Sequence, residues 1–221
     1  MVKKVLDILS KASLHLKSKK CEFHKIEVKY LGLIISAEGI KIDPKQVKAI
    51  VEWGSPKILH DLQAFLGFSN FYRLFILGYS ELVAHMIKLT KKDVKFIWNE
   101  DCKRAFNQSK NEFISVLVLM HFNAEKDIII ETDTSDYVSV GIMLQYDDNR
   151  ILHLWAYFSK KHSLAKCNYK TYDKELMAII QCFEEWRLEL RLTPHHIRVI
   201  SGYQNPEYFM STKLLSCRQA R

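Results

Sequence analysis

The sequence predicts an α+β protein with a β-rich beginning, a mostly helical middle and a final α/β unit of order β-β-β-α-β-α. Three observations support this fold class: the period of the apolar residues changes along the chain, turn residues separate the periodic runs, and 48% of the 221 residues are apolar. A chain of this length and composition forms one large domain or two small ones. With 7 Gly and 4 Pro, it is neither a low-complexity nor a fibrous sequence.

The first half of the chain predicts one amphipathic helix, a small sheet and then further helices. Residues 2–16 carry apolar side chains at helical spacing, and residues 21–23, 28–36 and 40–42 are β-rich segments of an antiparallel meander. Asp43-Pro44 predicts a helix start, because an acidic N-cap precedes proline at the first helical position. Residues 59–92 are helical in pattern, and Asn99 caps a further helix.

The last third predicts three antiparallel strands over residues 127–133, 138–146 and 151–159. A long helix follows from about Asn168, and a fourth strand covers residues 197–201. Because the helix returns the chain across the sheet, this fourth strand can lie parallel to the first. Another helix is expected from Pro206 onward.

Charge and cysteine usage restrict the class of protein. Residues 1–124 carry 20 Lys and Arg against 12 Asp and Glu, whereas residues 125–221 carry 13 of each. A basic first half favours contact with a polyanion, and a lysine-rich solvated surface is the alternative. The five cysteines are scattered, which is typical of free thiols in a reducing compartment. No apolar run is long enough for a membrane helix, so we expect an intracellular protein that is neither secreted nor membrane-bound.

Two carboxylates stand at positions suited to a metal site. Asp133 ends an apolar strand, and Glu175 lies early in the long helix, next to its buried stripe. An acid on a central strand and an acid on the helix above it are the ligands that a divalent cation requires. Alternatively, Asp133 caps the following turn and Glu175 stabilises the helix N-terminus. Spacing alone favours this alternative.

Several multi-residue motifs resemble the Pol polyproteins of Ty3/gypsy-type retrotransposons. The motifs in the second half are Thr132-Asp133-Thr134-Ser135-Asp136-Tyr137, Ala156-Tyr157-Phe158-Ser159 and Tyr172-Asp173-Lys174-Glu175-Leu176. Those in the first half are Tyr30-Leu31-Gly32, Gly39-Ile40-Lys41-Ile42-Asp43-Pro44 and Leu62-Gln63-Ala64-Phe65-Leu66-Gly67. The resemblance implies the end of a reverse transcriptase palm over residues 1–43, a helical thumb and connecting region over 44–122, and an incomplete, C-terminally truncated ribonuclease H-like domain over 123–221.

The resemblance also implies a chemistry, and this chain departs from it. In the family, four carboxylates bind two Mg²⁺ or Mn²⁺ ions that hydrolyse the RNA strand of an RNA/DNA hybrid. Asp133 matches the first carboxylate and Glu175 the second, both as metal ligands and as catalytic residues. Gly202 stands where the third is expected, and the fourth would lie beyond Arg221. We therefore expect weak or incomplete metal binding and no useful nuclease activity.

The polymerase part lacks its catalytic motif in this sequence. An aromatic-x-Asp-Asp hairpin would precede residue 1, and Tyr146-Asp147-Asp148 is better explained as a turn between two strands. By the resemblance, Tyr30, Leu31, Gly32 and Arg73 contact an RNA/DNA hybrid or a template–primer duplex. Phe65, Phe68 and Phe71 are expected in the core.

Three functional hypotheses follow. The first is a segment of a retrotransposon reverse transcriptase and ribonuclease H that has lost its activity, with the remainder of the Pol polyprotein as its partner. The second is a non-catalytic nucleic-acid-binding or accessory module. The third is an active nuclease whose missing carboxylates come from an intact domain or from a longer form of this protein.

Overall fold

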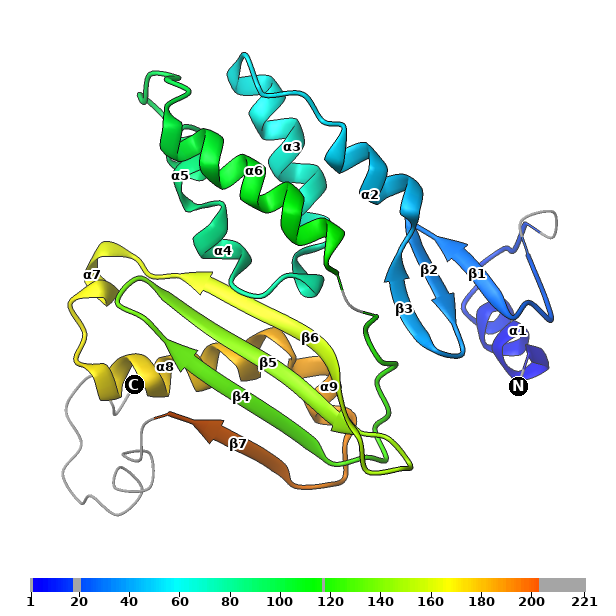
Figure 1. Ribbon diagram of the computed structural model, residues 1–221. Coiled ribbons are helices and arrows are strands. Elements are labelled where there is room, and N and C mark those ends of the chain that lie inside the picture. The colour runs from blue at the N-terminus through cyan, green and yellow to red at the C-terminus, as the bar shows by residue number, and fades with distance from the viewer. Residues whose placement is uncertain (1, 18–20, 117, 203–221) are drawn as a thin grey trace, which may run out of the picture.

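The computed structural model describes residues 2–17, 21–116 and 118–202. Figure 1 shows a helical region above a four-stranded sheet, with a three-stranded sheet at one side. This arrangement confirms the predicted α+β class. The helix predicted from Pro206 lies outside the described residues.

The N-terminal segment forms a helix and the small sheet. Helix α1 spans Val2–Lys11, and the antiparallel strands are β1 Glu27–Tyr30, β2 Leu33–Ser36 and β3 Gly39–Ile42. The helix is shorter than predicted because Ser13 takes φ 57°, and the amide of Leu14 bonds back to Leu9 O at 2.9 Å.

The meander also differs from its prediction. The expected strand 28–36 is divided into β1 and β2 by a turn at Leu31 and Gly32, whose φ angles are 50° and 79°. Two successive positive φ angles are typical of the tight hairpin turn that matches the twist of paired strands. Residues 21–23 form no strand, and the φ of 55° at His24 interrupts the extended run before β1.

Short helices make up the middle of the chain. They are α2 Pro44–Val51, α3 Leu59–Phe71, the 3₁₀ helix η2 Arg73–Phe75, α4 Tyr79–Leu82, α5 Ala84–Lys88 and α6 Glu100–Ile114. Both predicted caps are confirmed: Asp43 Oδ1 accepts from the amide of Lys45, and Asn99 Oδ1 from that of Cys102, each at 3.0 Å. Gly78, at φ 65°, separates η2 from α4 within the region predicted as helical.

These helices share one apolar core. Its fully buried members include Ile50, Leu62, Phe65, Met86 and Phe113. Phe68 packs at its edge, but Phe71 is 48% exposed, so the prediction that Phe71 belongs to the core is wrong. As the last residue of α3, Phe71 stacks only against the edge of the neighbouring Tyr72 ring within the described aromatic contacts.

The larger sheet has the strand order β6-β5-β4-β7. Its strands are β4 Ile128–Thr134, β5 Val138–Tyr146, β6 Leu152–Lys161 and β7 Ile197–Ser201, and the helices between β6 and β7 are α7 Leu164–Cys167, α8 Thr171–Glu185 and α9 Arg187–Leu192. β4 pairs antiparallel with β5 and parallel with β7, as predicted.

The two faces of this sheet have different neighbours. Ile128, Ile130 and Met143 pack with Cys182 and Trp186 of the α8 segment in a second core. Because side chains alternate along a strand, Glu131 and Asp133 point to the opposite face. On that side, η2 and α4 pack against β6, so the edge of the sheet is covered by the helical region (Figure 1).

Within the described residues, no helix has the length and apolar character needed to span a membrane.

Candidate functional site

Asp133 lies near the end of β4 on the face turned toward the helical region. Its side chain is exposed, and Oδ1 accepts a hydrogen bond from the amide of Thr134 at 2.8 Å. This local bond is the turn-capping role considered as an alternative to metal binding. It uses one oxygen lone pair and leaves the other carboxylate oxygen available.

Glu175 lies one turn into α8 and is 5% exposed. Its Oε2 accepts a hydrogen bond from Ser201 Oγ at 3.0 Å, which joins α8 to the end of β7. Burial raises the pKa of the Glu175 carboxyl; the Ser201 bond opposes this rise, and the negative charge of Asp133 adds to it. The two predicted carboxylates are therefore near enough to interact electrostatically.

Gly202 follows Ser201 and borders the same cavity as Asp133. A Cβ placed on Gly202 would meet no atom within 4 Å. The position that would supply a third carboxylate thus has room for a side chain but carries none.

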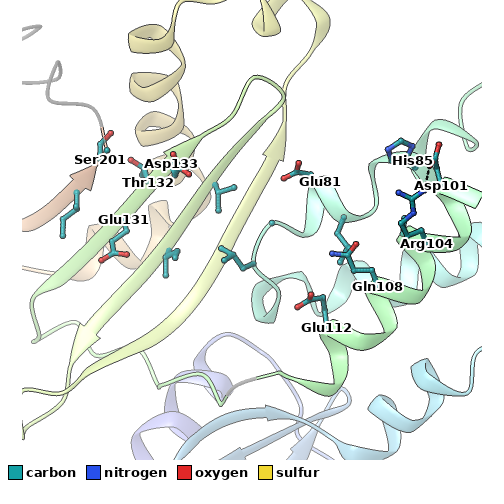
Figure 2. A pocket seen from close by; sticks show the side chains of 18 residues that line it. Glu81, His85, Asp101, Arg104, Gln108, Glu112, Glu131, Thr132, Asp133 and Ser201 are labelled. Atoms are coloured by element: carbon teal, nitrogen blue, oxygen red, sulfur yellow. Dashed lines mark hydrogen bonds and ion pairs between the residues drawn. The ribbon is translucent and has the colours of Figure 1, made fainter.

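A cavity of about 890 Å³ lies between the helical region and the open face of the sheet. Figure 2 shows its polar side chains, which come from α4 to α6 on one side and from β4 and β7 on the other. Its charged lining is mainly acidic and consists of Glu81, Asp101, Glu112, Glu131, Asp133 and Arg104. The guanidinium of Arg104 is paired with Asp101 at 3.0 Å, so the cavity is electronegative.

The predicted nucleic-acid contacts Tyr30, Leu31 and Gly32 form the tip of the β1–β2 hairpin. The Tyr30 side chain is 60% exposed and the Leu31 side chain 64% exposed. The amide of Asp43 donates to Gly32 O at 2.9 Å, and a Cβ on Gly32 would collide with the hydroxyl of Tyr72. The backbone of the tip therefore packs closely against Asp43 and Tyr72, while the side chains of Tyr30 and Leu31 face solvent.

Arg73 forms its ion pair away from this hairpin tip. Its guanidinium contacts Glu185 Oε1 at 2.6 Å, at the end of α8. The pair joins the helical region to the sheet domain. A phosphate contact by Arg73 stays a prediction, and it would compete with Glu185 for the guanidinium.

Tyr146 is the last residue of β5, and Asp147-Asp148 lies in the turn that leads to β6, as predicted. Asp147 Oδ1 accepts from the amides of Asn149 and Ile151, both at 2.8 Å. These bonds lower the pKa of Asp147, with the Ile151 amide as the largest cause. The carboxylate is thereby used in shaping the turn.

The sequence comparisons agree with this geometry. Residues 98–199 match the family model described as the RNase H-like domain found in reverse transcriptase. This part of the chain is similar to that family. The chain is also 36% identical over 206 residues to the Transposon Tf2-3 and Tf2-4 polyproteins of Schizosaccharomyces pombe, which covers 92% of this chain and 15% of each polyprotein. The resemblance to Ty3/gypsy-type polyproteins is thus confirmed, and the chain spans about 15% of the length of these relatives.

Solved structures with the same fold come from a foamy virus. A protease-reverse transcriptase in complex with RNA/DNA hybrid has a TM-score of 0.76 at 22% identity, covering 99% of this chain and 30% of that chain. A second, in complex with dsDNA, has a TM-score of 0.74 at 22% identity, covering 96% and 44%. At this identity the likeness shows the fold.

RNase H-like domains generally use divalent metal ions, and the described residues fit such an ion incompletely. Among residues 2–17, 21–116 and 118–202, no three His, Cys, Asp or Glu side chains are grouped closely enough to hold a metal. Asp133 and Glu175 supply hard oxygen ligands, and two carboxylates can hold one octahedral cation together with water and phosphate. They do not form a binuclear centre. The assignments of Asp133 and Glu175 as ligands stay predictions.

Two polar features of this RNase H-like domain were not singled out from the sequence. Ser201 bonds to Glu175, and Lys174 pairs with Asp136 at 2.6 Å. A lysine adjacent to a glutamate on the buried side of a helix was the available signal for the second feature. The family model begins at residue 98 and so includes α6; the predicted boundaries at 43/44 and 122/123 stay predictions.

Proposed function

We propose that this chain is a nucleic-acid-binding segment of a Ty3/gypsy-type Pol polyprotein whose RNase H-like domain does not cleave RNA/DNA hybrids. The observation that carries this proposal is Gly202. It lies at the cavity that Asp133 also lines, where a side chain would fit and no ligand is present. Two-metal hydrolysis requires both cations, because one activates the attacking water and the other stabilises the leaving oxygen.

Asp133 and Glu175 together would hold a single Mg²⁺ or Mn²⁺ ion weakly. The hydrogen bond from Ser201 occupies one lone pair of Glu175 Oε2, and burial favours the protonated form of this carboxyl. Both effects reduce the affinity of Glu175 for a cation. Water and substrate phosphate would complete the coordination.

Nucleic-acid binding is supported by charge and by the exposed hairpin. The excess of positive charge lies within residues 1–124, and Tyr30 and Leu31, in the same half of the chain, are exposed. The foamy virus protease-reverse transcriptases of similar fold are in complex with dsDNA or with an RNA/DNA hybrid. The partners proposed for this chain are a hybrid or template–primer duplex and the rest of the Pol polyprotein, in an intracellular setting.

A gain-of-function variant tests the nuclease part. Purified wild-type chain is expected to leave a labelled RNA/DNA hybrid intact in Mg²⁺ or Mn²⁺. Gly202→Asp places a third carboxylate beside Asp133 and is expected to raise cleavage at least about tenfold above background, the change produced by about 1.4 kcal/mol of barrier. Gly202→Asn is the matched control, since it has the same shape without the charge.

Two outcomes would contradict this part of the proposal. One is metal-dependent cleavage by the wild-type chain that Asp133→Asn abolishes. The other is equal cleavage by Gly202→Asp and Gly202→Asn, which would exclude a ligand role for the new carboxylate.

Fluorescence anisotropy with a labelled hybrid tests the binding part. Because phosphate contacts release counterions, affinity should fall steeply and linearly on a log–log plot between about 50 and 200 mM salt. An affinity that does not change with salt would contradict electrostatic binding.

A further inference from the structure

Lys174 is a buried lysine directly before Glu175 in α8. It is 5% exposed, and its ammonium contacts Asp136 Oδ1 at 2.6 Å. Asp136 belongs to the turn that follows β4, three residues after Asp133. This ion pair therefore connects the helix that carries one proposed ligand with the turn beside the other.

The Asp136 turn is also held by the residue that follows β6. His162, 5% exposed, donates from Nδ1 to Asp136 O at 3.2 Å, because a carbonyl can only accept. This assigns the neutral ring as an acceptor at Nε2, where Ser139 Oγ lies at 2.8 Å. The amide of His162 donates to Tyr137 O at 2.7 Å. The turn is thus fixed to β6 on one side and to α8 on the other.

The pairing at Lys174 is not what apolar packing would select for stability. Burial of the Lys174 ammonium removes its solvation by water. Water also weakens the attraction between Lys174 and Asp136, because 78% of the Asp136 side chain is exposed. A long apolar side chain would fill the same space without that loss. The contribution of the ion pair is positional, because it holds the first turn of α8 in a fixed register against the end of β4.

We propose that Lys174 and Asp136 are positioning residues that set the separation between Asp133 and Glu175. The inference rests on the proposed single-cation site formed by those two carboxylates. Groups that orient metal ligands are commonly worth about 10- to 100-fold in metal affinity. Lys174 and Asp136 would act on the cation through the backbone that carries its ligands.

Native-state hydrogen exchange tests the connection without any metal. Asp136→Ala is expected to speed amide exchange at least about tenfold both in the turn at 134–138 and at the start of α8. Asp148→Ala is the matched control, because Asp148 is an exposed turn residue paired with Lys126 at 2.7 Å at the other end of the sheet. Unchanged exchange in both segments of Asp136→Ala would overturn the proposal.

Mn²⁺ affinity, followed by electron paramagnetic resonance, separates positioning from simple stabilisation. Asp136→Ala and Lys174→Met should each weaken Mn²⁺ binding by about 10-fold or more, and Asp148→Ala should not. The double variant Lys174→Met/Asp136→Ala has the wild-type net charge. It should bind as weakly as the single variants; recovery of wild-type affinity would overturn positioning and assign the effect to charge alone.

The same measurements distinguish the two proposals. Absence of an Asp133-dependent Mn²⁺ site in the wild type would contradict the proposed cation site, and the exchange data would still decide whether the ion pair orders both segments. Conversely, a wild-type Mn²⁺ site that is unaffected by Asp136→Ala and Lys174→Met would contradict the positioning role alone.

Discussion

Ser80 donates two hydrogen bonds to Ser159 across the junction between the helical region and the larger sheet. The amide of Ser80 donates to Ser159 Oγ at 2.8 Å, and Ser80 Oγ donates to Ser159 O at 2.7 Å. The first residue lies in α4 and the second in β6, 79 positions later. With the Arg73–Glu185 pair, these bonds make the helices and the RNase H-like domain structurally dependent on each other.

Ser80→Ala is expected to lower the free energy of unfolding by about 1 kcal/mol, because it removes one part-buried hydrogen bond. Ser159→Ala should have a similar effect. Urea denaturation with a double-mutant cycle measures their coupling. Ser115→Ala is the control, since Ser115 is exposed and bonds only to a carbonyl of its own helix among the described contacts. Single variants that lose no more stability than Ser115→Ala would contradict the junction.

Gly141→Ala is expected to destabilise the domain by about 1–3 kcal/mol, because a Cβ there collides with Sγ of Cys182 and approaches Trp186. Cys182→Ala should relieve part of this loss, so that the double variant is more stable than additivity predicts. Gly67→Ala provides the control, since Gly67 lies in α3 with nothing near its Cβ position. Equal thermal shifts for the two glycine variants would refute this packing.

Stability should fall as pH decreases below about 6.5. Burial lowers the pKa of His162 from its ordinary value of 6.5; the bond to the Asp136 carbonyl and the Asp136 charge oppose this, and the charges of Lys174 and Lys166 add to it. As pH falls, His162 is therefore protonated first in the unfolded chain. No stability is lost above the pKa of His162 in the unfolded chain. Below it the loss grows until the pH passes the pKa of His162 in the folded chain. Urea midpoints between pH 7.5 and 5 measure it.

His162→Gln should remove this part of the pH dependence, whereas His195→Gln, at an exposed position, should not. An unchanged slope in His162→Gln would show that another group is responsible. Because His162 supports the Asp136 turn, the same variant should also speed amide exchange in that turn.

Tyr30→Ala is expected to leave the thermal midpoint nearly unchanged and to weaken hybrid binding several-fold. The side chain is 60% exposed at the hairpin tip, and stacking of an aromatic ring on a base is worth about 1–3 kcal/mol. Ile26→Ala removes an 89% exposed apolar side chain just before β1 and serves as the control. Equal affinities for the two variants would contradict a role for Tyr30.

The sequence was most informative where local chemistry determines structure. The strand at 197–201 and the caps at Asp43 and Asn99 were predicted, because periodicity and capping act over a few residues. The local pattern predicted one continuous strand over residues 28–36, because leucine at position 31 gives no signal for a positive φ. Gly78 separates η2 from α4, and α4 packs against β6, a contact between distant segments that the local pattern does not reveal.

Part of the candidate site could be predicted from the sequence for the same reason. Asp133, Glu175 and the missing acid at Gly202 follow from motif positions. The Ser201–Glu175 bond and the Lys174–Asp136 pair join residues 26 and 38 positions apart, which spacing along the chain does not reveal. The Arg73–Glu185 pair spans 112 positions and changes what the arginine was expected to contact.

The acidic lining of the cavity makes it an unfavourable path for a nucleic acid. Five carboxylates face a single guanidinium that is already paired, so a phosphodiester gains no attraction by crossing this space. A duplex that approaches Asp133 would come over the rim where β4 and β7 end, with the helices as a wall behind it. Small cations, in contrast, would be attracted into the cavity, where they would screen the negative charge of its carboxylates.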